Sequence, residues 1–204
     1  MRRLAKLVNG PRSVLASIDN SVLQWLHSHA TPVGITICLA ISRVGSPLTI
    51  TILAIAGGVA LAMRREWILL GGWAVAFTGA SALDRWLKLA VHRPRPVYAA
   101  RLMHHATWSF PSGHAMGSVV GFGMLAYVVL VLGPRSRPMR RLIVTASVGL
   151  IAAVGISRLY LGVHYVSDVI GGYVAGLLWL SGCIAATETA RHWRNRPLRL
   201  HPMG

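Results

Sequence analysis

The stretch Ala115–Leu132, AMGSVVGFGMLAYVVLVL, decides the class of fold. It carries no charged residue, and it is long enough to cross a bilayer as a helix, for which about 17–25 residues are needed. Four further stretches have the same character, so the sequence predicts an all-α, polytopic membrane bundle with five clear transmembrane helices. The other four are Pro47–Met63, Trp67–Leu89, Leu142–Ser157 and Val166–Ala186.

The composition also indicates a membrane environment. Hydrophobic residues make up 54% of the 204 residues and charged residues 13%, whereas a soluble domain carries about 25% charged residues. Lysine and arginine total 21 against five acidic residues. This basic excess lies mostly in short links between the apolar stretches, which is typical of membrane topology signals. No basic stripe with interleaved aromatic residues is present, so nucleic-acid binding is not expected.

The basic links predict an orientation, because cytoplasmic loops of membrane proteins are enriched in lysine and arginine. With these links in the cytoplasm, the remaining loops face the extracytoplasmic side of a cell membrane (inner or plasma), which the chain crosses several times. No compact apolar run with a cleavage site follows the N-terminus, so no removable signal peptide is expected. The basic links are Arg64-Arg65, the cluster Arg135, Arg137, Arg140 and Arg141, and the tail with Arg191, Arg194, Arg196 and Arg199.

The chain divides into a basic N-terminal region (1–45), a membrane core (46–187) and a basic cytoplasmic tail (188–204). Two hypotheses apply to residues 14–43. Asp19 and other polar residues interrupt the apolar pattern there, which favours an amphipathic helix at the membrane interface. The basic residues before it favour a cytoplasmic N-terminus, which requires a marginal sixth span.

Lys88 and Arg95 form the first motif, at the end of the stretch Trp67–Leu89. Arg95 can offer a planar fork to two phosphate oxygens, and Lys88 adds a compact charge. The prolines that follow Arg93 and Arg95 bias both arginines toward extended backbone. The alternative is that both cations are interfacial anchors, with Asp84 pairing with Lys88 one helical turn away.

Pro111-Ser112-Gly113-His114 is the second motif, and it opens the apolar helix that follows. The first N–H groups of a helix are unpaired and its N-terminus is partly positive, so an anion fits there. Ser112 can donate its hydroxyl to a phosphate, Gly113 allows close backbone approach, and His114 lies within reach of the bound group. The alternative is a plain helix start with Ser112 as its cap.

Ser157-Arg158, His164 and Asp168 form the third motif. His164 and Asp168 are four residues apart, which predicts that they share one helical face. A carboxylate there can hold the proton of one imidazole nitrogen and direct the other nitrogen outward as a nucleophile. Arg158 adds a third cation for the charge of phosphoryl transfer. The alternative is an interfacial ion pair between Arg158 and Asp168.

Together these motifs, Lys-x6-Arg-Pro, Pro-Ser-Gly-His and Ser-Arg-x5-His-x3-Asp, resemble the three signature motifs of the type 2 phosphatidic acid phosphatase superfamily. They occur in the family's order, and the resemblance covers roughly residues 46–186. The chain departs from the family pattern at the N-terminus: membrane members of the family typically have six spans, and a clear first span is missing here. The resemblance implies a membrane lipid phosphatase.

The resemblance also implies a covalent mechanism. His164 would attack phosphorus and form a phosphohistidine oriented by Asp168, while His114 would protonate the leaving oxygen and then activate water. Asp168 is the one acidic residue in the motifs, so a two-metal carboxylate site is not expected, and neither a metal nor a cofactor is predicted. The groups implied to hold the phosphoryl oxygens are Lys88, Arg95, Arg158, Ser112 and the Gly113 amide.

The expected partners are the bilayer and a membrane lipid phosphate that approaches laterally. Undecaprenyl diphosphate is favoured, with phosphatidylglycerophosphate, phosphatidic acid or a lipid phosphotransferase reaction as alternatives. A non-enzymatic phospholipid-binding or transport protein is an alternative of another class. A serine hydrolase using Ser112 is disfavoured because the Gly-x-Ser-x-Gly elbow is absent. The sequence makes no prediction of oligomeric state.

Overall fold

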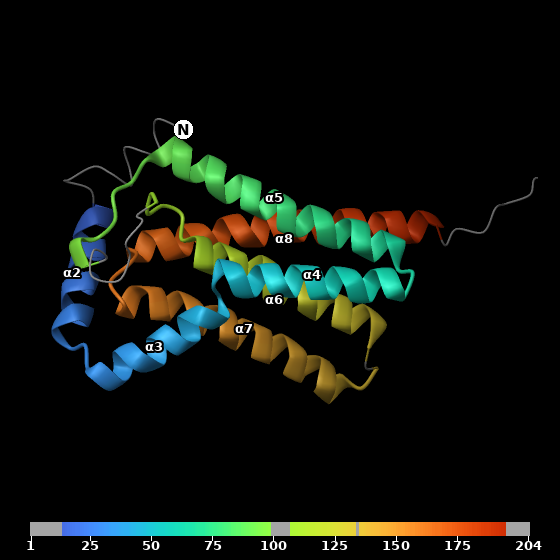
Figure 1. Ribbon diagram of the computed structural model, residues 1–204, viewed down its shortest axis with the longest axis horizontal. Coiled ribbons are helices and arrows are strands. Elements are labelled where there is room, and N and C mark those ends of the chain that lie inside the picture. The colour runs from blue at the N-terminus through green and yellow to red at the C-terminus, as the bar shows by residue number, and fades with distance from the viewer. Residues whose placement is uncertain (1–13, 99–106, 134, 195–204) are drawn as a thin grey trace, which may run out of the picture.

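The part of the chain that its computed structural model describes, residues 14–98, 107–133 and 135–194, consists of helices joined by short non-helical segments (Figure 1). No strand occurs in these ranges, so the predicted all-α class is confirmed. Residues 1–13 and 195–204, with the tail residues Arg196 and Arg199, lie outside them. The helices are α2 (Val14–Ser28), α3 (Pro32–Val44), α4 (Pro47–Met63), α5 (Trp67–Val91), α6 (Gly113–Leu132), α7 (Arg137–Tyr160) and α8 (Val166–Arg194).

Five helical stretches of the described chain are long and apolar enough to cross a membrane. Each contains one of the five predicted stretches, so the prediction of a polytopic membrane bundle is confirmed. Helices α7 and α8 run past their predicted ends, because long basic side chains at a helix end can reach toward water while the backbone stays helical. The five spans are Pro32–Met63, Trp67–Val91, Gly113–Leu132, Arg137–Tyr160 and Val166–Arg194.

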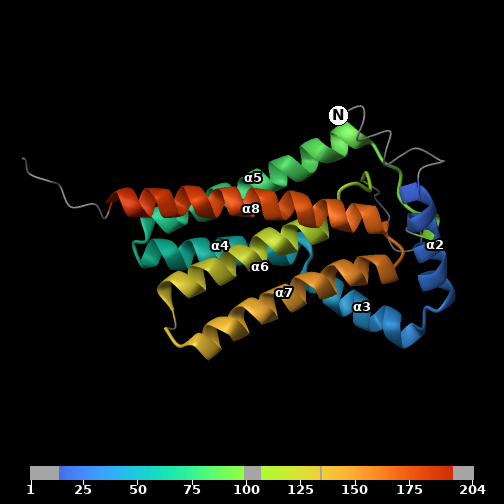
Figure 2. The same cartoon turned by 180° about the vertical axis from the view of Figure 1, so that it is seen from behind.

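The N-terminal segment forms two helices rather than one. Helix α2 lies across one end of the bundle, whereas α3 runs along α7 and leads into α4 (Figures 1 and 2). Between them the side chain of Thr31 accepts a hydrogen bond of 3.1 Å from the Gly34 amide, and Pro32 opens α3; both are helix-start signals. Residues 14–43 are therefore not one helix. The location of α2 at a membrane interface stays a prediction.

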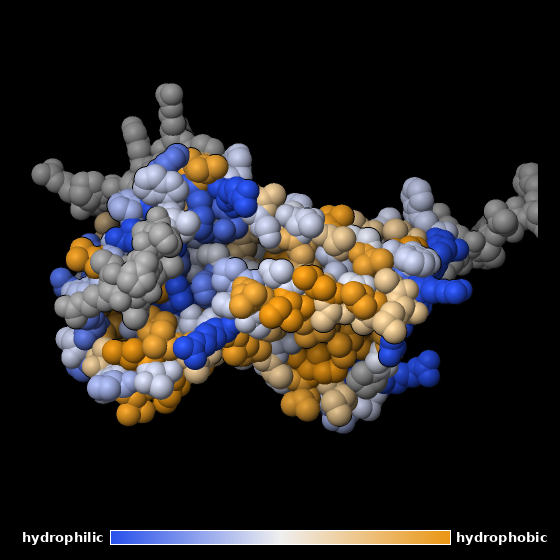
Figure 3. Space-filling model, viewed as in Figure 1, coloured by the Kyte–Doolittle hydropathy of each residue, from blue (hydrophilic) through white to orange (hydrophobic). Residues whose placement is uncertain are grey.

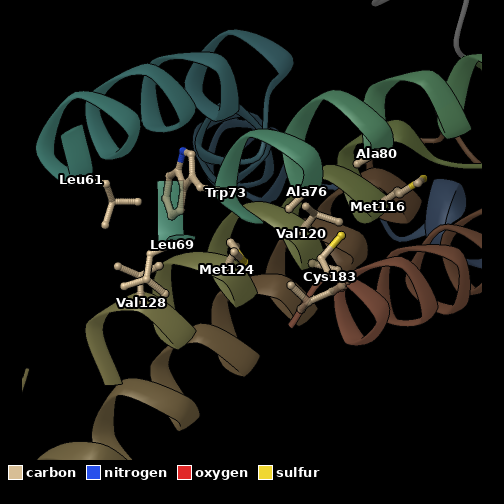
Figure 4. Close-up of a cluster of buried hydrophobic side chains, with 12 residues drawn as sticks. Leu61, Leu69, Trp73, Ala76, Ala80, Met116, Val120, Met124, Val128 and Cys183 are labelled. Atoms are coloured by element: carbon tan, nitrogen blue, oxygen red, sulfur yellow. The ribbon is translucent and has the colours of Figure 1, made fainter. Parts of the chain in front are cut away.

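Helix α6 is the centre of the bundle. Met116, Val120 and Met124 recur every four residues along one of its faces, and each is at most 1% exposed. They form a core with Trp73 of α5 and Leu180 of α8 (Figure 4 shows the first four of these side chains). Because α6 is packed on several sides, the position of its N-terminus is tightly determined.

The surface matches a lipid environment. Hydrophobic residues cover the middle of the molecule, and hydrophilic residues gather at both ends (Figure 3). Leu48 and Leu178 are examples of exposed hydrophobic residues, with 70% and 72% of their surface exposed. An apolar surface of this extent is unfavourable in water and favourable in hydrocarbon. The molecule is therefore an integral membrane protein.

One end of the bundle collects all three motifs. Helices α5 and α7 end there, and helices α6 and α8 begin there, beside the crossing helix α2 (Figure 2). The opposite end carries the described basic links, because α4 ends and α7 begins at that side. The alternation of motif loops and basic links along the sequence thus corresponds to two opposite ends of one bundle.

Candidate active site

The motif residues surround one cavity of about 440 Å³ at the α2 end of the bundle. Six of the eight predicted site residues line it, and the other two, Ser112 and Asp168, are buried beside it with 0% of their surface exposed. The wall also includes Asp84, Thr107 and apolar residues of α4 and α5. The six are Lys88, Arg95, Gly113, His114, Arg158 and His164.

Lys88 joins the end of α5 to the start of the second motif. Its ammonium group donates to the Asp84 carboxylate at 2.5 Å and to the Pro111 carbonyl oxygen at 2.8 Å. The ion pair between Asp84 and Lys88, which was considered from the sequence, is therefore present. It does not remove Lys88 from the site, because an ammonium has three donors and the residue still lines the cavity.

Arg95 is held by backbone oxygens on two sides of the cavity. Its Nε donates to the Thr107 carbonyl at 2.8 Å, and its Nη1 donates to the Val163 carbonyl at 3.0 Å. Nη1 also lies 3.1 Å from Nε2 of His164. A guanidinium can only donate, so Nε2 carries a lone pair and the ring proton sits on Nδ1. Burial lowers the pKa of Arg95 from its ordinary value, and the group stays charged near neutral pH.

The second motif starts α6 as predicted. Ser112 is the N-cap, and its hydroxyl accepts from the Ala115 amide at 3.5 Å, while its own amide donates to the Asp168 carbonyl at 2.9 Å. The Ser112 hydroxyl therefore caps helix α6. Gly113 lies against the cavity, where an added Cβ would come within 3.4 Å of the Lys88 nitrogen. Gly113 and His114 both line the cavity.

Helix α8 approaches this motif at Gly172. An added Cβ at Gly172 would lie 2.7 Å from the Ser112 carbonyl oxygen, closer than real Cβ contacts. The absence of a side chain thus lets α8 bring Asp168 beside the start of α6.

Arg158 comes from the last turn of α7 and is 6% exposed. Its Nη1 donates to the Ser42 hydroxyl of α3 at 2.5 Å. Its Nε is a buried donor with no hydrogen-bond partner among the described residues. An ion pair between Arg158 and Asp168, the alternative from the sequence, does not form, because Asp168 pairs with Arg93 instead. A buried guanidinium with a free donor beside the cavity fits an anionic ligand.

His164 and Asp168 meet, but not on one helical face as expected. His164 lies in the turn before α8, and Asp168 lies in its first turn. The turn folds back so that Nδ1 of His164 is 3.5 Å from Oδ2 of Asp168 and 3.4 Å from the Ser109 hydroxyl. The carboxylate therefore faces the protonated nitrogen, and Nε2 faces Arg95 and the cavity.

Burial sets the protonation state of His164. The ring is 1% exposed, and desolvation lowers its pKa to about 4, with the Asp168 hydrogen bond opposing the shift and the Arg95 charge adding to it. The imidazole is thus neutral at neutral pH. A neutral ring with a lone pair on Nε2 is the form that a histidine nucleophile requires.

The sequence interpretation missed three residues near His164 and Asp168. Arg93 donates to Asp168 at 2.6 Å, and Ser109 donates to the other carboxylate oxygen at 2.5 Å. Asp19 of α2 accepts from Arg93 at 2.7 Å. Arg93 had a signal, since it is a second arginine beside Arg95 in the segment between α5 and α6. Asp19 had none, because it lies far from every motif along the chain.

Within the described ranges, no group of three or more His, Cys, Asp or Glu side chains is arranged to hold a metal ion. Asp84 and Asp168 both lie near the cavity, but Asp84 is paired with Lys88 and Asp168 with Arg93. The described side chains thus suit an anion better than a cation. The prediction of a metal-independent reaction stays a prediction.

Sequence comparison finds a family for most of the bundle. The family model of the PAP2 superfamily matches residues 66–192. Phosphatidylglycerophosphatase B of Bacillus subtilis is 38% identical over 96 residues, which are 47% of this chain and 47% of the relative. Decaprenylphosphoryl-5-phosphoribose phosphatase of Mycobacterium tuberculosis is 34% identical over 129 residues, 61% of this chain and 64% of the relative. The chain thus spans about half to two thirds of these curated relatives.

Two solved structures resemble the whole bundle. A transmembrane PAP2-type phosphatidylglycerolphosphate phosphatase from Bacillus subtilis superimposes with a TM-score of 0.78 at 25% identity, covering 95% of this chain and 94% of that one. LpxE of Aquifex aeolicus superimposes with a TM-score of 0.58 at 18% identity, covering 82% and 94%. The second match concerns the fold alone.

Proposed function

The chain belongs to the PAP2 superfamily, and on this premise we propose that it is a membrane phosphatase that removes the terminal phosphate of a lipid through a phosphohistidine at His164. One observation carries the proposal. The lone pair on Nε2 of the neutral His164 faces a cavity that Lys88, Arg95 and Arg158 line with positive charge. A neutral nucleophile among permanent cations suits a phosphoryl group, whose attack concentrates negative charge on the equatorial oxygens.

In the first half of the reaction, Nε2 of His164 forms a bond to phosphorus as the bond from phosphorus to the lipid oxygen breaks. Arg95 moves its guanidinium from Nε2 to the phosphoryl oxygens and so frees the lone pair. His114 gives a proton to the leaving oxygen. The proton on Nδ1 stays between the ring and Asp168, whose negative charge stabilises the positive phosphohistidine.

In the second half, His114 takes a proton from water, and the hydroxide attacks phosphorus. The bond between Nε2 and phosphorus breaks, inorganic phosphate leaves, and His164 regains its lone pair. Lys88, Arg158 and the Gly113 amide hold the same oxygens in both halves. The free Nε donor of Arg158 supports this assignment.

A lipid tail has a place beside this cavity. A groove of about 880 Å³ runs between α4 and α5, and its lining is mostly apolar, with Ile55, Val59 and Phe77 among its residues. The groove and the cavity share wall residues, including Arg85. A lipid can therefore lie with its chain in the groove and its phosphate at His164, without leaving the bilayer.

Phosphatidylglycerophosphate is the first candidate substrate, because the Bacillus subtilis relative and the similar solved structure from Bacillus subtilis both bear that activity in their names. A polyprenyl substrate such as undecaprenyl diphosphate is the second, and the decaprenyl relative supports it. Both offer a terminal phosphate on a membrane lipid, which is what the cavity and groove require.

The site faces the extracytoplasmic side of the cell membrane in this proposal. The basic residues of the opposite end, such as Arg64, Arg137 and Arg194, support it because cytoplasmic ends are enriched in such residues. A cysteine introduced at Val97, which is 87% exposed at the site end, should react with an impermeant maleimide added outside intact cells. Labelling only after lysis would reverse the orientation.

The enzymatic test uses purified protein in detergent with EDTA present. Phosphate release is measured from phosphatidylglycerophosphate, undecaprenyl diphosphate and phosphatidic acid. His164→Ala should abolish release from every lipid, whereas His192→Ala, an exposed histidine of α8 at the opposite end, should leave it unchanged. The relative rates rank the substrates.

Three outcomes would overturn the proposal. Release that EDTA abolishes would contradict a histidine mechanism without metal. Lipid binding without release or transfer of phosphate would favour a binding or transport protein, and transfer to a second lipid in place of water would identify a phosphotransferase.

A further inference from the structure

A buried chain of charges links the N-terminal helix to the catalytic carboxylate. Arg93 donates from Nη2 to Asp19 at 2.7 Å and from Nη1 to Asp168 at 2.6 Å, so one guanidinium bridges two carboxylates. All three side chains are at most 6% exposed. They come from α2, from the segment after α5, and from the first turn of α8. Three parts of the chain thus meet behind His164.

Ser167 and Tyr165 close this cluster. Asp19 accepts from the Ser167 amide at 2.9 Å and from its hydroxyl at 2.5 Å, and that hydroxyl also lies 2.7 Å from Arg93. The Arg93 guanidinium stacks 4.1 Å from the centre of the Tyr165 ring. Asp19 therefore holds both Arg93 and the backbone of the first turn of α8, which carries Asp168.

The carboxylate of Asp168 has little freedom left. Oδ1 accepts from Arg93, and Oδ2 accepts from the Ser109 hydroxyl and from the Tyr165 amide at 2.9 Å. Rotation of the carboxylate would break all three bonds. Its Oδ2 is also the atom nearest Nδ1 of His164, so the frame that fixes Asp168 fixes the direction of the imidazole.

Stability alone is a weak reason for this arrangement. Desolvation of buried charges offsets much of their attraction, and apolar residues of similar size often stabilise a protein equally well. Charge balance suggests a catalytic reason. A single Arg93 beside Asp168 would neutralise the carboxylate, whereas Asp19 shares the guanidinium and leaves Asp168 with net negative charge toward the ring.

We propose that Asp19 and Arg93 are positioning residues of the reaction, which act through Asp168 to orient His164, and that helix α2 is therefore a functional part of the active site. This inference rests on the proposed function. It assigns a role in catalysis to Asp19, which lies far from the three motifs along the chain, and to Arg93, which occupies an unspecified position of the first motif. Neither residue touches the phosphoryl group, since neither lines the cavity.

The test measures kcat and KM for phosphate release by Asp19→Asn and Arg93→Gln, each in the wild-type and in an Asp168→Asn background. Removing a partner that orients a catalytic group typically costs about 10–100-fold. We expect Arg93→Gln to lower kcat by about that factor and Asp19→Asn to lower it less, both with little change in KM. In the Asp168→Asn background neither substitution should lower kcat further, because residues that act as a unit are not additive.

Glu188→Gln is the matched control. Glu188 forms an ion pair of 2.7 Å with Arg191 and accepts from Tyr127 at 2.6 Å, far along α8 from the site. It should leave kcat unchanged. Melting temperatures in detergent are measured for all variants, and Asp19→Asn keeps the shape of the side chain and the Arg93–Asp168 pair, so it is informative even if Arg93→Gln does not fold.

Three results would overturn the inference while wild-type activity is normal. These are an unchanged kcat in Asp19→Asn, a rise in KM with kcat preserved, or a loss that persists in full in the Asp168→Asn background. A wild-type protein that releases no phosphate would instead overturn the proposed function, and this inference with it.

Discussion

Nη1 of Arg95 lies 3.1 Å from Nε2 of His164, so the cation from the first motif contacts the nitrogen that attacks phosphorus in the proposed mechanism. Two carbonyl oxygens, of Thr107 and Val163, hold the same guanidinium. In the proposed mechanism Arg95 thus has two roles: it fixes the tautomer of the ring before attack, and it binds the phosphoryl oxygens during attack.

Arg95→Gln should therefore lower kcat/KM by about 10²–10³-fold, the usual effect of removing one donor that stabilises a developing negative charge. Arg95→Lys should recover only part of the loss, because an ammonium lacks the planar fork. Arg140→Gln is a control, since the Arg140 side chain donates to the Leu130 carbonyl at the opposite end of the bundle. Equal activity of Arg95→Gln and wild type would contradict a role for Arg95 in the reaction.

The pH dependence of kcat should reflect the buried state of His164. Attack needs the neutral ring, and its pKa is about 4, so activity should persist below pH 6.5 and fall only near pH 4. The charged groups facing the ring are Arg95, Arg158 and Asp168. Removal of the Arg95 charge in Arg95→Gln makes the protonated ring less unfavourable, so the acid limb should move to higher pH.

Rates measured between pH 3.5 and 8 with a saturating lipid check this prediction. Arg95→Lys keeps the charge and should keep the limb in place. An acid limb near pH 6.5 in the wild type would mean that the ring is not desolvated during the reaction.

Arg85 should distinguish substrates with a second phosphate from those without one. It lines both the groove and the cavity, and it is exposed, so its charge lies on the path between the lipid chain and His164. We expect Arg85→Gln to raise KM several-fold for undecaprenyl diphosphate and phosphatidylglycerophosphate and to change KM little for phosphatidic acid. The measurement is KM for the three lipids side by side, and an equal rise for all three would indicate a general effect of charge.

Gly172→Ala should impair both stability and activity. The new Cβ would lie 2.7 Å from the Ser112 carbonyl oxygen and 3.1 Å from the Ala115 side chain, so α8 would have to move away from the start of α6. Overpacking of this kind typically costs about 1–3 kcal/mol. Gly182→Ala is the matched control on the same helix, because among the described residues no atom outside its own stretch of α8 lies within 4 Å of its added Cβ.

Melting temperature and kcat of the two alanine variants, measured in the same detergent, check this prediction. A Gly172→Ala protein with wild-type stability would show that the helices can separate without loss.

Much of the fold and the site could be predicted from the sequence. Apolar length is a local property, so each predicted span lies within a helix of the bundle. The start of α6 at Gly113 was also predictable, because Ser112 caps it through local bonds. The grouping of motif residues followed from the alternation of motif loops and basic links, which sends the three motifs to one end.

Other features depended on contacts between distant segments. The spacing of His164 and Asp168 predicted their contact, but the reason was wrong, since a turn rather than a shared helical face joins them. From the sequence, the N-terminal segment was treated as one stretch that either lies at the interface or spans the membrane, although Thr31 and Pro32 divide it into two helices. The partner of Asp168 was also unpredictable, because Arg93 and Asp19 meet it only after α2 crosses the end of the bundle.

The sequence by itself determined the membrane class, the helix positions and the chemical inventory of the site, because hydrophobic length, helix caps and motif spacing act over short distances along the chain. Only the tertiary structure decided which cation faces which carboxylate. Lys88 pairs with Asp84 one helical turn away, which the sequence had offered as an alternative, but the choice of Arg93 for Asp168 and of His164 for Arg95 was made by the tertiary structure. Those choices depend on packing of helices around α6 and on the desolvation of charges, and neither is encoded in any single segment.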